Sequence, residues 1–395
     1  MSGTRRRRRG YAAVTPGRYL PRIAATPQSP PVRAPPSRVS GPRATDTRTT
    51  KSRMKAIIPL AGKGTRLRPH THLTPKPLLR VAGKPLLDFI LDDLLAAGVD
   101  QMIFVVGHLQ NAVRAHVAER YPQVTARYVV QEVQDGTAGA VGLAEPWADD
   151  ELLILFADTL FKVDLGITRT LDRSRAGVIW AKEVEDYQRY GVILTDGAGD
   201  MTRIVEKPRE PVSRLANIGL YYIRDHELLF EGIRRTLGDG PGPSGEFYLT
   251  DAFQYMVDAG ARIVTAPVEM WLDAGNVDAL LEANRRLVSG TRGGVARGAL
   301  LRESVVSPCA RVEDGACVTG SRIGDNVTVE AGARVTGSEL RDTIVGADAT
   351  VEDSRLWKSI VGRSAAVRGF EGALGLVDHS KVDARSPNGR ERIDP

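Results

Sequence analysis

Cysteine is scarce in this sequence, with only Cys309 and Cys317 among 395 residues. The two lie eight positions apart without a second pair or nearby histidines, so they match neither a zinc site nor a secreted disulfide scaffold. This scarcity favours a reducing compartment, and we expect a cytoplasmic protein. The six histidines, among them His70 and His72, likewise form no metal-ligand spacing.

Long apolar runs are also missing. No stretch approaches the roughly 18 consecutive apolar residues of a membrane-spanning helix, and no signal-peptide core is present. The composition, 42% hydrophobic and 26% charged, is that of a globular protein with enough chain for two domains. We therefore expect no membrane partner.

Acidic residues are nearly absent from the first 53 positions, which hold 13 lysines and arginines and only Asp46 as an acid. This segment also contains eight prolines and few large apolar residues, so it cannot bury enough surface to offset its ordering entropy. We predict a disordered, basic tail over residues 1–53. The rest of the chain has 41 basic and 47 acidic residues, which argues against a specific nucleic-acid partner.

Three interpretations of this tail stay open. It could be an inert extension, because a strongly patterned strand begins directly after it at Met54. It could be an arginine-rich organelle presequence, although its prolines would break the amphipathic helix that such peptides form. It could also be an arm that contacts nucleic acid or an anionic surface.

From Met54 to about Ser289, apolar strand-like runs alternate with helix-like stretches. This alternation predicts an α/β domain over residues 54–290, with a doubly wound, Rossmann-like sheet covered by helices on both faces. The expected strands are 55–60, 101–106, 152–156, 177–182, 191–195, 204–207, 217–223 and 261–265, and the expected helices include 85–97 and 277–287. The glycine-rich and proline-rich stretch 238–245 is expected to be a surface loop.

Beyond Gly293 an aliphatic residue recurs every five or six positions, and small residues and turn formers fill the gaps. Three such steps make 17, 17 and 16 residues, so each triple could form one triangular coil. The repeat resembles a hexapeptide-repeat, left-handed parallel β-helix, which we expect over residues 295–370 in about four coils, with 371–395 as cap and tail. Short strands of an ordinary sandwich are the alternative. The repeating positions are Val306, Val312, Val318, Ile323, Val329, Val335, Leu340, Val345, Val351, Leu356, Val361 and Val367.

A glycine-containing loop, Leu60-Ala-Gly-Lys-Gly-Thr-Arg-Leu-Arg-Pro69, follows the first expected strand. Gly62 and Gly64 let backbone amides approach phosphate oxygens closely. Open parallel sheets bind ligands at the carboxyl ends of their strands, where this loop lies. It has neither the Gly-Lys-Ser/Thr of a Walker loop nor the third glycine of a dinucleotide fingerprint.

Further motifs follow this loop in a fixed order. They are Thr74-Pro-Lys76-Pro, Gly83-Lys-Pro85, Gln131 with Asp135-Gly-Thr137, Leu155-Phe-Ala-Asp158, Glu206-Lys-Pro208, Asn217-Ile-Gly219 and Trp271-Leu-Asp273. Together with the loop they resemble the signature of the sugar-1-phosphate nucleotidylyltransferases, or NDP-sugar pyrophosphorylases. With the β-helix added, the chain resembles the long form of the glucose-1-phosphate thymidylyltransferases. The resemblance implies a mixed, GT-A-like sheet.

The resemblance also implies a reaction, the transfer of a nucleoside monophosphate from an NTP to a sugar 1-phosphate with release of pyrophosphate. It implies that Asp158 and Asp273 hold Mg²⁺, that Arg66 braces the pyrophosphate and that Lys76 neutralises the α-phosphate. The nucleotide-binding positions that it implies are Leu60, Ala61, Gly62, Gly64, Thr65, Gln131, Gly136 and Thr137. The implied sugar-phosphate positions are Gly191, Glu206, Lys207 and Asn217.

Within this family we expect dTTP or UTP and glucose 1-phosphate as substrates, and a homo-oligomer paired through the β-helix. A mannose-1-phosphate guanylyltransferase is an alternative, because the stretch Gly136-Thr-Ala-Gly-Ala140 is closer to guanylyl- and uridylyltransferases. A bifunctional enzyme with acetyltransferase activity is another, although no histidine occurs between residues 291 and 378 to act as its base. A non-catalytic regulatory module is the third, and it could dispense with the charged residues that are present here.

Overall fold

A computed structural model describes residues 54–242 and 244–385. Our expectation of a disordered tail over residues 1–53 lies outside the described residues, as does the end of the expected C-terminal tail. The described residues belong to one compact unit. None of their helices combines the length and the hydrophobicity that crossing a bilayer requires.

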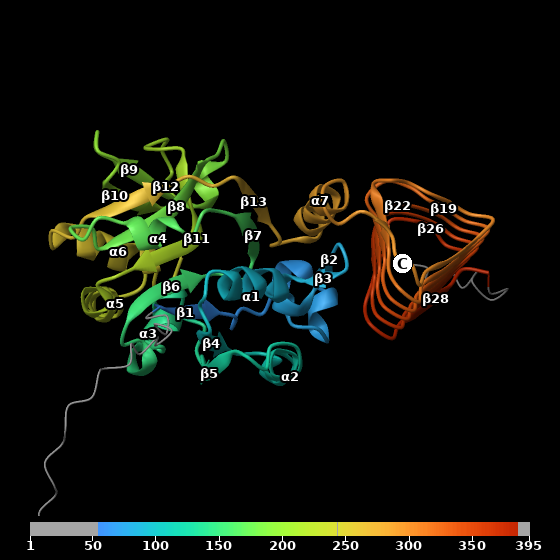
Figure 1. Ribbon diagram of the computed structural model, residues 1–395, viewed down its shortest axis with the longest axis horizontal. Helices are drawn as coiled ribbons and strands as arrows, with labels where there is room; N and C mark the ends of the chain where they lie inside the picture. Colours follow the sequence, from blue (N-terminus) through green and yellow to red (C-terminus); the bar gives the residue numbers. More distant parts are fainter. Residues whose placement is uncertain (1–53, 243, 386–395) are drawn as a thin grey trace, which may run out of the picture. The chain divides into compact units, whose positions relative to one another are not determined.

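The first part of the chain folds around a mixed β-sheet, which confirms the expected fold class (Figure 1). Its strands are β1 (Met54–Pro59), β4 (Gln101–Val106), β5 (Thr125–Val130), β6 (Glu151–Leu155), β8 (Gly177–Glu183), β9 (Gly191–Thr195), β10 (Met201–Glu206), β11 (Leu215–Ile223) and β12 (Ile263–Ala266). They follow the order β10-β9-β11-β6-β1-β4-β5, and β8 pairs with β11 and β12. Strands β6, β1, β4 and β5 are parallel, so their carboxyl ends share one edge, whereas β11 runs antiparallel to β6.

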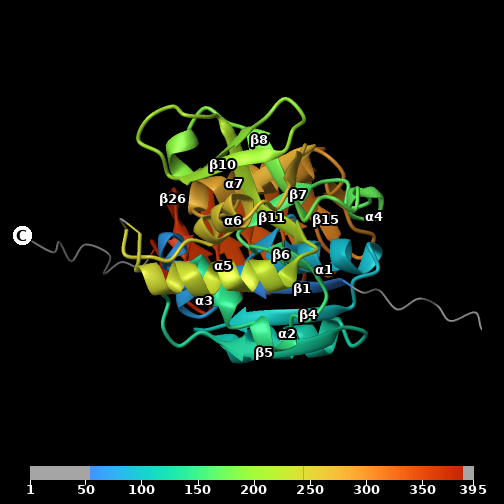
Figure 2. The same ribbon diagram turned by 90° about the vertical axis from the view of Figure 1, so that its left-hand side faces the viewer.

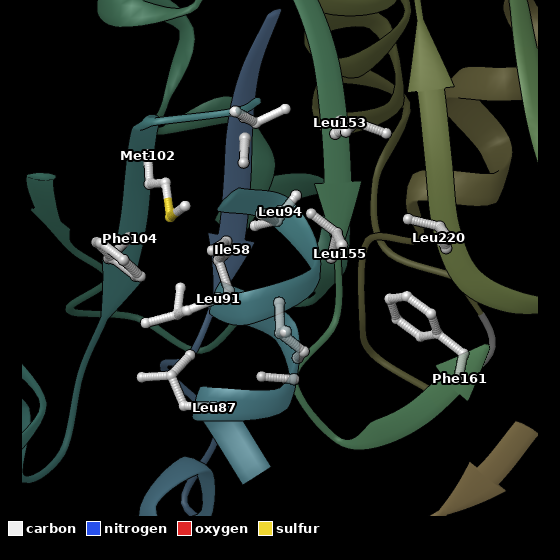
Figure 3. Packing of buried hydrophobic residues seen from close by; sticks show 14 of the residues in the cluster. Ile58, Leu87, Leu91, Leu94, Met102, Phe104, Leu153, Leu155, Phe161 and Leu220 are labelled. Atoms are coloured by element: carbon white, nitrogen blue, oxygen red, sulfur yellow. The ribbon is translucent and has the colours of Figure 1, made fainter. Parts of the chain in front are cut away.

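Helices cover both faces of the sheet because its central strands are buried on both sides. Neighbouring side chains of β1 point to opposite faces, so that Ile58 belongs to one core with Leu91 and Phe104, and Ile57 belongs to a second core with Phe253. Figure 3 shows the first core, and Figure 2 views the molecule from the side of α5 and α6. The helices are α1 (Leu86–Ala96), α2 (Gln110–Arg120), α3 (Thr137–Gly142), α4 (Ile167–Thr170), α5 (His226–Asp239), α6 (Leu249–Asp258) and α7 (Val277–Val288).

Two smaller pairs of strands lie outside the main sheet. The hairpin of β2 (Arg80–Val81) and β3 (Lys84–Pro85) precedes α1. Strands β7 (Thr159–Lys162) and β13 (Met270–Asp273) pair antiparallel, although more than 100 residues separate them in the sequence. This second pair brings two distant segments of the chain to the same edge of the main sheet.

The last part of the chain is a parallel β-helix, drawn in orange to red in Figure 1. The expected aliphatic positions stack in register, as in the ladder where Val329 lies between Val312 and Val345. The strands are β14 (Gly294–Val295), β15 (Leu300–Arg302), β16 (Val305–Val306), β17 (Ala310–Val312), β18 (Cys317–Thr319), β19 (Arg322–Ile323), β20 (Val327–Val329), β21 (Arg334–Thr336), β22 (Glu339–Val345), β23 (Thr350–Glu352), β24 (Arg355–Val361), β25 (Ala366–Arg368), β26 (Glu371–Gly372), β27 (Gly375–Leu376) and β28 (Lys381–Asp383).

This β-helix is longer than the four coils that the repeat predicted. One ladder runs through six strands, β15-β18-β21-β23-β25-β28. Strands β26, β27 and β28 pair in parallel with the coil before them, so residues 371–383 extend the stack in the segment where we expected a cap. Gly372 takes the position next to Leu356 in place of an aliphatic residue and interrupts the sequence pattern, whereas Leu376 and Val382 continue the ladders of Val361 and Val367.

Candidate active site

A cavity of about 610 Å³ opens at the shared carboxyl edge of β6, β1 and β5. Every residue to which the sequence analysis gave a catalytic, metal, nucleotide or sugar-phosphate role lies on its wall, and none of them lies elsewhere. The segment after β1 contributes Leu60, Ala61, Gly62, Gly64, Thr65, Arg66 and Lys76, the segment after β5 contributes Gln131, Gly136 and Thr137, and later segments contribute Asp158, Gly191, Glu206, Lys207, Asn217 and Asp273.

The glycine loop leaves β1 and turns back on itself at Gly64. Its φ of 60° lies in the left-handed region that favours glycine. A Cβ at this position would lie 3.0 Å from Thr71 Cγ2 and 3.2 Å from Lys76 Cβ, so the absence of a side chain allows Lys76 to approach the loop. Among the described residues, apart from its two chain neighbours, none has an atom within 4 Å of the position that a Cβ on Gly62 would take. The loop is therefore packed on one side at Gly64 and open at Gly62.

The two aspartates predicted to hold a metal come together through the β7/β13 pair. Asp273 is opposite Thr159 in the register of this pair, and Thr159 directly follows Asp158. The N–H of Gly275 donates to Asp273 Oδ1 over 2.7 Å, which fixes the orientation of that carboxylate. The side chains of Asp158 and Asp273 are 47% and 25% exposed, so each keeps oxygen atoms available to a ligand in the cavity.

Basic side chains surround these carboxylates. Lys76 Nζ lies 3.5 Å from Asp158 Oδ2, and the lysine side chain is only 12% exposed. The guanidinium of Arg66 packs beside Gly275, where an added Cβ would lie 3.1 Å from Arg66 Nη2. Positive charge is thus held where phosphate groups would meet the two aspartates.

At one end of the cavity, Gln131 is held in a single orientation. Its Nε2 donates to Asp135 Oδ1 over 3.0 Å and to the Gly136 carbonyl over 3.3 Å. Both partners accept hydrogen bonds, so the amide nitrogen faces them and Oε1 is the atom left for a ligand. Gly136 has a φ of 124°, and a Cβ there would lie 2.4 Å from the Phe247 carbonyl oxygen, so only glycine fits this position.

At another part of the wall, Gly191, Glu206 and Asn217 pack tightly together. A Cβ on Gly191 would lie 2.4 Å from Asn217 Nδ2 and 2.8 Å from Glu206 Oε2. Asn217 Nδ2 donates to the Gly191 carbonyl over 2.8 Å, and Thr250 Oγ1 donates to Glu206 Oε2 over 3.2 Å. Burial raises the pKa of the Glu206 carboxyl above its ordinary value, against the opposing effect of the Lys207 ammonium.

Lys207 completes this region. Its backbone has a φ of 44°, and its N–H donates to the Tyr190 carbonyl over 3.0 Å. The ammonium lies 4.7 Å from the centroid of the Tyr248 ring and 3.6 Å from Glu206 Oε1, while the side chain stays 46% exposed. Lys207 can therefore present its charge to an anion in the cavity.

The sequence analysis missed several residues of the wall. Arg189 Nη2 lies 3.3 Å from Asp273 Oδ2, and the Tyr190 ring meets the Trp271 ring edge-on at 5.0 Å between centroids. Gln134 Nε2 donates to the Ala61 carbonyl over 2.6 Å. Arg189 and Tyr190 directly precede Gly191, which was assigned to the site. Their position beside Gly191 was the sequence signal that could have identified them. Gln134 directly precedes the Asp135-Gly-Thr137 motif, so it carried the same signal.

The donor set at Asp158 and Asp273 fits Mg²⁺. This ion is bound in proteins by one or two carboxylates and takes its other ligands from water and substrate phosphates. Within the described ranges, no group of three or more His, Cys, Asp and Glu side chains could hold a metal by itself. Two carboxylates on the wall of this cavity are therefore suited to an ion whose remaining ligands are phosphate oxygens of the substrate.

Comparison with known proteins places this site in a family, since residues 55–290 match the family described as Nucleotidyl transferase. The chain belongs to this family. A glucose-1-phosphate thymidylyltransferase of Streptomyces antibioticus is 32% identical over 362 residues, which cover 84% of this chain and all of the relative. A UTP–glucose-1-phosphate uridylyltransferase of Haloferax volcanii is 31% identical over 243 residues, which cover 60% of this chain and 98% of the relative.

Two further known proteins are similar to part of this chain. The bifunctional protein GlmU of Methanocaldococcus jannaschii is 31% identical over 263 residues, 67% of this chain and 61% of the relative. A solved structure of UDP-glucose pyrophosphorylase complexed with UDP-glucose superposes with a TM-score of 0.53 at 24% identity, and covers 60% of this chain and 98% of that one. This last likeness shows that the fold is shared.

Proposed function

We propose that this protein transfers a nucleoside monophosphate from an NTP to a sugar 1-phosphate and releases pyrophosphate, with glucose 1-phosphate and dTTP or UTP as its substrates. The observation that carries the proposal is the convergence of Arg66, Lys76, Asp158, Lys207 and Asp273 on one cavity. A phosphate oxygen of the sugar 1-phosphate attacks the α-phosphorus of the NTP, and the bond from that phosphorus to the pyrophosphate oxygen breaks. Such a transfer needs alignment and charge neutralisation more than covalent help from the protein.

Each charged side chain has a task in this reaction. The amides of the glycine loop bind the triphosphate, and Arg66 stabilises the leaving pyrophosphate with its forked guanidinium. Lys76 neutralises charge that builds up on the α-phosphate. Lys207 holds the phosphate of the sugar, whose hydroxyls hydrogen-bond to Glu206 and Asn217.

Asp158 and Asp273 are proposed to hold Mg²⁺. When bound, the ion supplies electrostatic stabilisation to the phosphate oxygens. Lys76, which contacts Asp158, orients that carboxylate and limits the repulsion between it and the incoming phosphates.

The orientation of Gln131 supports a particular class of base. Because Oε1 is its free atom, the side chain accepts a hydrogen bond, and opposite the ring nitrogen of the Watson–Crick edge it therefore favours a base that carries an N–H on that nitrogen. Thymine and uracil have such a donor at N3, and guanine has one at N1, whereas cytosine and adenine have acceptors at the equivalent positions. The thymidylyl and uridylyl relatives support the two pyrimidines.

A panel of nucleoside triphosphates tested against several sugar 1-phosphates with Mg²⁺, read by pyrophosphate release, tests the proposal. We expect dTTP or UTP with glucose 1-phosphate to give the highest kcat/KM and CTP and ATP to be poor. Preference for GTP with mannose 1-phosphate would instead identify a guanylyltransferase. Failure of every pair would favour a regulatory module, and acetyl transfer from acetyl-CoA to a sugar phosphate would favour a bifunctional enzyme.

We also propose that the protein forms a homo-oligomer through its β-helix. Leu300 and Val305 on the first coil are 56% and 62% exposed, and large exposed aliphatic side chains favour contact with another copy. Sedimentation at micromolar concentration tests this, and a monomer would contradict it.

A further inference from the structure

The loop that joins the two basic residues of the phosphate site is attached to the far end of the β-helix. This linking loop, residues 68–75, runs from the turn that carries Arg66 to the turn that begins at Lys76. Thr74 Oγ1, in this loop, donates to Asp378 Oδ2 over 2.7 Å, although the two residues are 304 positions apart. Thr74 itself is not on the wall of the cavity.

Asp378 is held firmly at its own position. Its other carboxylate oxygen, Oδ1, accepts a hydrogen bond from the Arg363 N–H over 2.8 Å, which ties the last turn of the β-helix to the coil before it. One oxygen of Asp378 is thus fixed by the β-helix, and the other holds Thr74. A carboxylate with both oxygens bonded in this way forms a rigid link between the two segments.

A second contact lies beside the first. His70 of the linking loop is only 6% exposed, and its Nε2 is buried without a hydrogen-bond partner among the described residues. A Cβ on Gly375, in β27, would lie 3.3 Å from this nitrogen. The imidazole is therefore pressed against the backbone of the last coil, and a glycine there leaves room for it.

Apolar side chains on both sides of the same loop belong to a buried cluster. Leu67 and Leu79 flank the segment on both sides, and they belong to one buried cluster with Ile344 and Ile360 of the β-helix. The flanks of the segment thus share a buried cluster with α7 and the β-helix, while Thr74 and His70 contact the last coil.

We propose that the last coil of the β-helix positions the phosphate site: Asp378, through Thr74, and Gly375, against His70, hold the linking loop so that Arg66 and Lys76 lie where the triphosphate reacts. Thr74, His70, Gly375 and Asp378 are positioning residues, because none of them touches the cavity. The inference rests on the proposed nucleotidyl transfer. It adds that an element more than 300 residues further along the chain contributes to its rate.

Thr74→Val removes the hydroxyl and keeps the shape of the side chain. We expect kcat to fall about fivefold to tenfold, as loss of one positioning hydrogen bond allows. KM for the sugar phosphate should stay unchanged, because Glu206 at the end of β10 and Lys207 directly after it belong to another segment. Thr74→Ser, which keeps the hydroxyl, should restore kcat. The matched control is Thr236→Val, which removes the hydrogen bond of a buried threonine to the Gly232 carbonyl in α5, far from the loop. Equal kcat in Thr74→Val and Thr236→Val, or no recovery in Thr74→Ser, would overturn the proposal.

A second pair of variants separates positioning from the stability of the β-helix. Asp378→Ala removes the link to Thr74 and the turn contact with Arg363. Asp314→Ala removes an equivalent turn contact, 2.9 Å from its Oδ1 to the Gly298 N–H, between the first two coils and away from the loop. Only Asp378→Ala should lower kcat, and equal losses in both variants would overturn the proposal.

Hydrogen exchange measured on the full chain tests the positioning of the linking loop without depending on enzymatic activity. Peptides that cover residues 68–75 should exchange faster in Thr74→Val and Asp378→Ala than in the wild type and both controls. Unchanged exchange would overturn the positioning role even in an active enzyme. Faster exchange in a protein that releases no pyrophosphate with any substrate pair would contradict the proposed function and leave the structural link intact.

Discussion

The backbone N–H of Ala274 donates to the carbonyl oxygen of Asp158, with 2.9 Å between nitrogen and oxygen. This hydrogen bond continues the β7/β13 pair and joins the ends of two segments that are far apart in the sequence. Because Asp273 precedes Ala274, the bond brings both proposed metal ligands to one place.

Asp158→Asn should lower turnover by roughly 10²-fold or more and leave the fold intact, because the amide keeps the size of the carboxylate and removes its charge. Pyrophosphate release measures the loss, and the melting temperature checks the fold. Asp164→Asn, at an exposed position whose Oδ1 accepts from the Gly166 N–H, is the control and should be fully active. Wild-type turnover in Asp158→Asn would refute its assignment as a metal ligand.

Removal of divalent cations should abolish activity, and added Mg²⁺ should restore it. Asp273→Asn removes one of two proposed ligand charges, so the Mg²⁺ concentration needed for half-maximal turnover should rise by about tenfold or more. Titration of activity against Mg²⁺ at saturating substrates measures this shift. An unchanged Mg²⁺ requirement in Asp273→Asn would show that this carboxylate has another role.

The Glu206 carboxyl should give the sugar-phosphate KM a pH dependence. Its ionised form accepts hydrogen bonds from sugar hydroxyls, and protonation removes part of this capacity. Burial raises the pKa of this carboxyl. As the pH is lowered, KM should therefore begin to rise at a higher pH than it would if the carboxyl had its ordinary pKa. Glu206→Gln should have a higher KM that no longer changes in this range. KM for the NTP serves as the internal control and should not follow the same curve.

Gly136→Ala should destabilise the fold and weaken nucleotide binding. The new Cβ would lie 2.4 Å from the Phe247 carbonyl at a φ of 124°, so strain and overpacking should lower the free energy of unfolding by about 2 to 4 kcal/mol. Denaturant unfolding measures this change. Gly62→Ala is the matched comparison, because in the described part of the chain only its two chain neighbours could lie within 4 Å of its added Cβ. It should keep the stability and raise KM for the NTP, and equal destabilisation of both variants would contradict this assignment.

The local periods of the sequence predicted most of the fold. Alternation of strand-like and helix-like segments gave the α/β domain, and β4 and β9 begin and end where they were expected. The aliphatic period of the C-terminal part gave the register of the β-helix, since Val335 does lie between Val318 and Val351. These features depend on side chains that are close in the sequence, so they can be predicted from the sequence alone.

The wall of the cavity was also largely predictable, because each of its motifs follows a strand and the carboxyl ends of parallel strands meet. The contacts between those motifs were not. The ion pair of Arg189 with Asp273 spans 84 residues, and the orientation of Gln131 depends on which groups of the next turn face it. No local spacing specifies such pairs.

The sequence by itself determined the family, the succession of strands and the identity of the charged groups. The tertiary structure alone decided what the β-helix touches. Arg80 contacts Glu330 over 2.9 Å, and the glutamate side chain is only 3% exposed, whereas Asp314 and Asp348, in the corresponding turns of the neighbouring coils, are exposed. Which turn of a regular stack is covered depends on where another part of the chain docks, and that is fixed by the packing of surfaces distant in sequence.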